Sequence, residues 1–121
     1  MKLNKNAGII ALVDGIIIDA AVAGMALVRL QRTKRRLSLY RGNKSGLKIA
    51  GYIPPAFGVS ILSRLKIITG LDIRERHLVQ QGSHNYNITR NGVRSFMAIT
   101  VIIVPSLFLH EDVIITISDR A

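Results

Sequence analysis

Histidines and the acids near them are the residues of this chain best suited to catalysis or metal binding. His110 precedes Glu111 and Asp112, but no second histidine stands nearby at the spacing typical of a metal site. Ser83, His84 and Asp112 are of the types found in a catalytic triad, yet no nucleophile-elbow motif accompanies them. Turns between strands commonly collect such polar residues. We therefore expect residues 110–112 to form a polar turn, and we predict a protein that is not an enzyme and has no metal site or cofactor.

Basic residues between positions 29 and 48 are the feature that departs most from an ordinary composition. The chain carries 17 Lys and Arg against 7 Asp and Glu, a formal net charge of +10. Residues 1–48 contribute +8 of this charge and residues 49–121 contribute +2. Such lopsided positive charge indicates an anionic partner. The predicted anion- or phosphate-binding residues are Arg29, Arg32, Lys34, Arg35, Arg36, Arg41, Lys44 and Lys48.

This basic cluster suits two kinds of anionic surface. Contacts with nucleic-acid phosphate would be salt-dependent and largely independent of base sequence. Lipid headgroups would attract each Lys or Arg by about 1 kcal/mol near an anionic membrane. A face that only solubilises an apolar chain is the simplest alternative. Tyr40 alone adds an aromatic side chain within the cluster, so base stacking has weak support.

The stretch that must position the cluster, residues 7–28, is uncharged except for Asp14 and Asp19. As a helix it is long enough to span a bilayer, but each central Asp costs about 2.5–3.5 kcal/mol on insertion. In a second interpretation, Asp14-Gly15 is a hairpin turn between short strands. Asp19 is then the N-cap of an amphipathic helix over residues 20–37 that carries most of the basic side chains. A run of strands is the third interpretation.

Strand signals dominate the remainder of the chain. Asn91-Gly92, between two alternating segments, favours a type I′ hairpin and is the clearest local signal. The predicted register pairs Arg90 with Val93, Ile88 with Ser95 and Tyr86 with Met97. The other predicted strands are Val59–Thr69, Leu71–Val79, Phe96–Val104 and Val113–Ser118. Phe96–Val104 is nearly continuous in apolar residues, so we expect it to be buried on both faces.

Composition points to a chain that associates with other chains. Hydrophobic residues make up 49% of it and the mean hydropathy is +0.32, which is high for a small protein with this charge. The predicted fold is a β-rich α+β domain with a basic N-terminal helix and an antiparallel sheet, with an all-β fold as the close alternative. We expect one domain, 1–121, with a hydrophobic and basic segment 1–48 and a β-rich part 49–121.

These features predict a non-catalytic structural protein, a subunit of a larger assembly such as a virus or phage particle. Its partners would be copies of itself or other assembly subunits, and its basic surface would contact nucleic acid or an anionic lipid surface. One alternative is a membrane-anchored protein in which residues 7–28 span the bilayer. The other is a protein that binds nucleic acid independently of sequence. The expected location is accordingly a virion or a membrane.

Overall fold

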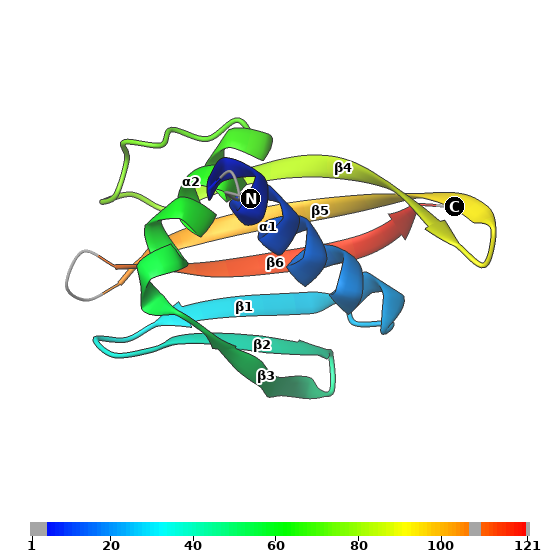
Figure 1. Cartoon of the computed structure of the whole chain (residues 1–121), viewed down its shortest axis with the longest axis horizontal. Helices are drawn as coiled ribbons and strands as arrows, with labels where there is room; N and C mark the ends of the chain where they lie inside the picture. Colours follow the sequence, from blue (N-terminus) through cyan, green and yellow to red (C-terminus); the bar gives the residue numbers. More distant parts are fainter. Residues whose placement is uncertain (1–4, 107–109, 121) are drawn as a thin grey trace.

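Two helices pack on one twisted antiparallel sheet in the computed structural model, which describes residues 5–106 and 110–120 (Figure 1). The described elements are α1 (Lys5–Val22), β1 (Leu27–Arg32), β2 (Leu37–Asn43), β3 (Gly46–Ile53), the 3₁₀ turn η1 (Pro55–Phe57), α2 (Gly58–Ile68), β4 (Gln80–Arg90), β5 (Val93–Pro105) and β6 (Glu111–Arg120). The strand order is β3-β2-β1-β6-β5-β4, so β1 and β6 meet at the centre of the sheet. The prediction of a mixed, sheet-rich fold is confirmed.

The N-terminal apolar stretch forms a continuous helix, α1. Val13, Ile17, Ala20 and Ala21 are buried and follow the i, i+4, i+7, i+8 spacing of a single helical stripe. The helix ends at a left-handed Gly24 (φ 76°), where the Gly24 N–H donates to Ala21 O and the Met25 N–H donates to Ala20 O. These two hydrogen bonds together form a Schellman motif.

Both predicted roles for the acids in this stretch are wrong. Asp14-Gly15 lies inside α1 instead of forming a hairpin turn, and Asp19 lies near the end of the helix instead of capping its start. Asp14 accepts a hydrogen bond from the Tyr86 hydroxyl (3.0 Å), which ties α1 to β4. Burial raises the pKa of the Tyr86 phenol above its usual range, and the bond to Asp14 raises it further.

The basic segment is a pair of strands, so the prediction of a basic helix over residues 20–37 is wrong. Gly24 ends α1, and the chain then continues as β1. Side chains of β1 alternate between the two faces of the sheet, and Val28 and Leu30 are buried on the face that carries the helices. Arg29 projects from the opposite face because successive side chains of a strand alternate. A turn over residues 33–36 returns the chain as β2.

The Asn91-Gly92 hairpin is confirmed with the predicted register. Arg90 pairs with Val93, Ile88 with Ser95 and Tyr86 with Met97. Asn91 and Gly92 both have positive φ (50° and 77°), as a type I′ turn requires. The strands predicted over Phe96–Val104 and Val113–Ser118 are also present, within β5 and β6.

Three other predictions fail between residues 59 and 112. The segment predicted as the strand Val59–Thr69 is helical as far as Ile68, because Gly58, Ile61 and Leu65 form a buried stripe at helical spacing. Residues 71–79 form turns and irregular backbone instead of a strand. Glu111 and Asp112 begin β6 and are not part of a turn, and Glu111 is buried.

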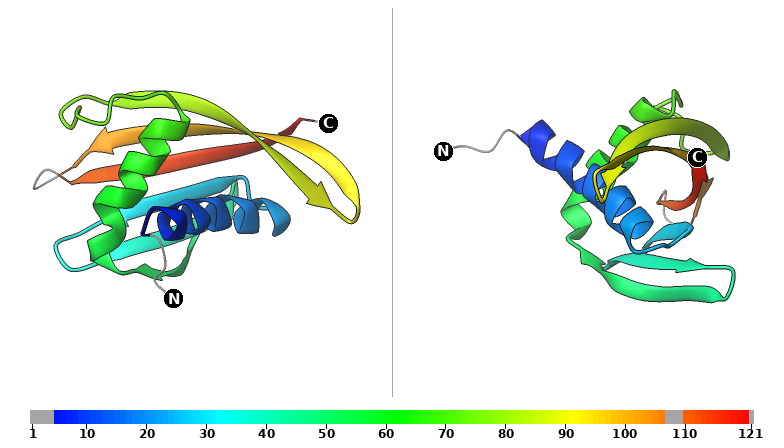
Figure 2. Two further views of the ribbon diagram at one scale, coloured as in Figure 1. Left: turned by 45° about the horizontal axis from the view of Figure 1, so that its top comes forward. Right: turned by 90° about the vertical axis from the view of Figure 1, so that its right-hand side faces the viewer.

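The two faces of the sheet have different surroundings. Both helices lie against one face, as Figure 2 shows from two directions, and that face contains the core residues Met97, Ile99, Val101 and Ile103 of β5. The alternate residues of β5 project from the other face and are partly exposed, so this strand is fully buried on one side only. No helix in the described part of the chain is both long enough and apolar enough to cross a membrane.

Candidate functional site

The β1–β2 turn gathers one half of the predicted basic cluster. Lys34, Arg35 and Arg36 are exposed in this turn, and Arg32 immediately precedes it. The Arg36 guanidinium lies over the ring of Tyr52, 5.0 Å from its centroid, and its Nη1 is 3.4 Å from the Tyr52 hydroxyl. We call Arg32, Lys34, Arg35 and Arg36 the basic turn.

The other half of the cluster lies elsewhere. Lys44 lies between β2 and β3, and Arg41 faces Lys48 directly in the β2–β3 register. About six residues of extended strand, roughly 20 Å, separate this group from the basic turn. Arg29 projects from the open face of the sheet, where its Nη2 is 3.9 Å from Asp112 Oδ2. The predicted site is therefore divided, and only four of its eight members lie together at the basic turn.

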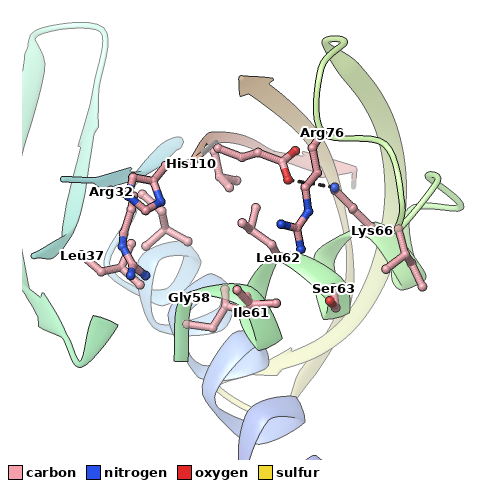
Figure 3. Close-up of a pocket in the computed structure, with 14 residues that line it drawn as sticks. Arg32, Leu37, Gly58, Ile61, Leu62, Ser63, Lys66, Arg76 and His110 are labelled. Carbon is pink, nitrogen blue, oxygen red and sulfur yellow. Dashed lines mark hydrogen bonds and ion pairs between the residues drawn. The ribbon is translucent and has the colours of Figure 1, made fainter. Parts of the chain in front are cut away.

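A pocket of about 240 Å³ opens beside the basic turn, between α2 and the starts of β2 and β6 (Figure 3). Its walls include apolar side chains of β1, β2, α2 and β6, and Ile73 of the 71–79 segment adds a further apolar contact. The polar and charged side chains that line it are Arg32, Ser63, Lys66, Arg76, His110 and Glu111.

A buried ion pair stands at one side of this pocket. The Lys66 ammonium of α2 donates to Glu111 Oε1 of β6 at 3.0 Å, and the two residues are 2% and 6% exposed. Lys66 Nζ also donates to the backbone carbonyl of Glu75 at 2.7 Å. The second carboxylate oxygen of Glu111, Oε2, has no hydrogen-bond partner among the described residues. Lys66 thus joins α2, the 71–79 segment and β6.

Arg32 enters the pocket from the opposite side. Its Nη1 donates to the carbonyl of Pro55 at 2.6 Å, while its Nε finds no partner in the described part of the chain. The backbone N–H of Arg32 donates to Asp112 Oδ1 at 3.2 Å and extends the β1–β6 pairing by one bond. Its guanidinium also lies against Gly58, where a Cβ would collide with it. Gly58 therefore leaves room for the Arg32 side chain.

Arg76 completes the charged lining. It is exposed, and its side chain extends from the 71–79 segment across the pocket toward Leu62 and Ser63 (Figure 3). Within residues 5–106 and 110–120 its guanidinium makes no hydrogen bond or ion pair that would hold it. Lys66 and Glu111 offset each other's charge, so the two arginines leave the pocket positive.

The combinations considered for catalysis are not assembled. Ser83 and His84 are consecutive in β4 and project from opposite faces of the sheet, and β5 separates both from Asp112. The described residues contain no group of three His, Asp or Glu side chains arranged to hold a metal ion.

Sequence reasoning identified Arg32 but missed Lys66 and Arg76. Lys66 stands in the apolar run Leu65-Lys66-Ile67-Ile68. A lysine among apolar residues indicates a buried ammonium group that needs an acidic partner, and this was the signal that could have identified it. Its partner Glu111 is 45 residues away, so local patterns could not identify the pair. No family model matches this sequence, and none of the characterised proteins compared with it is significantly similar.

Proposed function

We propose that this protein is a non-catalytic assembly subunit that associates with further copies of itself through the open face of its sheet. The patch concerned, which we call the open-face patch, contains Leu27, Ala98, Thr100, Ile102, Val104, Ile114 and Thr116. Its members come from three adjacent central strands, and most are only partly shielded within one chain. One observation carries the proposal: an apolar strip lies on the uncovered face, formed by Ala98, Ile102 and Val104 of β5 with Leu27 and Ile114 beside it.

Antiparallel sheets with one solvated face normally alternate apolar and polar residues. The outer strand β4 follows that rule, since Gln81, Ser83, Asn85, Asn87 and Thr89 occupy its open side. The central strand β5 departs from it, with Ala98, Ile102 and Val104 on its open side, and Leu27 of β1 and Ile114 of β6 lie beside them. An apolar centre beside a polar margin is the usual anatomy of a protein interface.

Two copies of this basic protein would meet with the least repulsion through the uncharged open-face patch. The protein has a net charge of +10, so like copies repel each other unless their contact surfaces carry little charge. The open-face patch itself has no ionisable member, and the neighbouring Arg29 and Asp112 form an ion pair within the same chain. Two such faces can pack as aligned sheets about 10 Å apart, with their side chains interdigitated.

Sedimentation velocity over a range of protein concentrations tests this association. Ile102 and Ile114 face each other in the β5–β6 register, so Ile102→Glu with Ile114→Glu puts two carboxylates at the centre of the patch. We expect this variant to remain monomeric where the unmodified protein associates. Ile67→Glu, which changes an exposed apolar residue of α2, is the matched control. Association that persists in the double variant, or an unmodified protein that stays monomeric throughout, would contradict the proposal.

The basic turn supports a second contact, with the phosphate backbone of nucleic acid. Its exposed cations lie beside Tyr52, which is 58% exposed and adds an aromatic surface to the Arg36 guanidinium. Aromatic and guanidinium groups together suit a nucleic acid better than a lipid headgroup, because bases stack on such planes.

Titration of single-stranded DNA by fluorescence anisotropy at several salt concentrations tests this contact. Replacing Lys34, Arg35 and Arg36 by Ala should weaken binding and reduce the salt slope by about 0.7 for each phosphate that is no longer neutralised. Replacing Arg41, Lys44 and Lys48 by Ala removes the same charge from the other group and is the control. Equal losses in both variants would show a general charge effect and contradict a site at the basic turn. Binding to anionic vesicles without binding to DNA would assign the turn to lipid.

A further inference from the structure

The pocket beside α2 has a surplus of positive charge that the protein leaves available. The buried pair of Lys66 and Glu111 is locally neutral. Arg32 uses one guanidinium nitrogen on Pro55 O, and the Arg76 guanidinium has no partner among the described residues. The two arginines reach the cavity from opposite sides (Figure 3). An anionic group in the cavity would therefore find guanidinium donors on both of these sides.

The remaining walls would contact an apolar group. Leu62 and Ile73 line the cavity, as do Leu30 and Val113 of the neighbouring strands β1 and β6. Its volume of about 240 Å³ exceeds the roughly 150 Å³ that is enough to hold benzene in an apolar cavity. A concave, largely apolar site with a few convergent polar groups is the usual form of a small-molecule site.

We propose that this pocket binds a small organic anion, a carboxylate or phosphate monoester attached to an apolar group about the size of a phenyl ring. Arg76 and Arg32 hold the anionic group, and the apolar walls hold the ring. The ion pair of Lys66 and Glu111 keeps α2 and β6 in place beside the ligand. This site is separate from the open-face patch, so it does not depend on the proposed assembly function.

Methyl NMR spectra of the full chain during titration with benzoate test the proposal. We expect the methyl signals of Leu62 and Ile73 to shift in a saturable way at millimolar concentrations, as for other fragments of this size. Benzamide has nearly the same shape without the charge, and it should bind at least about tenfold more weakly because the charge-assisted hydrogen bonds are lost. Phenyl phosphate in a parallel titration distinguishes preference for phosphate from preference for carboxylate.

Arg76→Ala is the decisive variant, because Arg76 is exposed and its removal leaves the core intact. We expect it to weaken binding of the preferred anion at least about tenfold. Arg74→Ala removes the same charge from an exposed neighbour that does not line the pocket, and it should leave the affinity unchanged. Equal affinities for benzoate and benzamide, equal losses in both variants, or no shift at the pocket methyls with either anion would each overturn the proposal.

Discussion

Replacing Lys66 by Met should be among the most destabilising single changes in this protein. The change removes the hydrogen bond to Glu111 Oε1 and the shorter one to Glu75 O. Glu111 Oε2 already lacks a partner in the described chain, so the carboxylate would remain 94% buried with no donor for either oxygen. Removing one member of such a buried pair costs about 3–5 kcal/mol, a large share of the 5–15 kcal/mol that typically stabilises a domain.

Urea unfolding followed by circular dichroism measures this cost, and a double-mutant cycle separates it from packing. Lys66→Met combined with Glu111→Leu leaves no unpaired charge, so we expect the double variant to recover at least about 2 kcal/mol relative to Lys66→Met alone. Lys44→Met, in the exposed β2–β3 turn, should stay within about 0.5 kcal/mol of the unmodified protein. A loss below about 1 kcal/mol for Lys66→Met, or a double variant as unstable as the sum of the singles, would refute this account of the pair.

Two further variants test how the helices are held on the sheet. Tyr86→Phe deletes the hydroxyl that donates to Asp14 and should cost about 1–2 kcal/mol near neutral pH. Because the folded protein raises the pKa of Tyr86 above its unfolded value near 10, unfolding releases a proton in alkaline solution and stability falls as the pH rises above about 10. Urea titrations across this pH range should show a smaller fall in the free energy of unfolding for Tyr86→Phe than for the unmodified protein. The same fall in both proteins would contradict the assignment of this pH dependence to Tyr86. Gly82→Ala would place a Cβ 2.5 Å from Thr69 O, so we expect a loss of about 1–3 kcal/mol in urea titrations. Gly51→Ala, with no atom within 4 Å of its new Cβ, should cost less than about 0.5 kcal/mol, and equal costs would contradict the steric explanation.

Local signals predicted the C-terminal strands well because their determinants are close in sequence. Asn91 and Gly92 tolerate positive φ and by themselves specify the turn and its register. The helices also had local signals, since Gly24 and Gly70 both terminate a helix in a left-handed conformation. The sequence interpretation instead predicted a turn at Asp14-Gly15. This dipeptide is helical in the structure because the apolar residues around it form a buried helical stripe.

The candidate sites depend on distances in space between residues, which the amino-acid composition does not specify. The basic residues between Arg32 and Lys48 are close in sequence, but the extended strand β2 lies between them. They therefore form two separate groups in space. Lys66 and Glu111 come together only because α2 crosses the start of β6. Such a pairing depends on strand order, which alternation and turn residues do not fix for six strands.

Alternation along β6 allows the two proposed sites to be tested independently. Val113 lies on the helix side and lines the pocket, whereas the next residue, Ile114, belongs to the open-face patch. Consecutive side chains of one strand thus serve opposite surfaces. A charge at Ile114 alters the proposed subunit contact and not the pocket, while removal of Arg76 alters the pocket and leaves the sheet face unchanged. If association and anion binding are distinct properties, Ile102→Glu with Ile114→Glu will abolish association and preserve anion binding, and Arg76→Ala will weaken anion binding and preserve association.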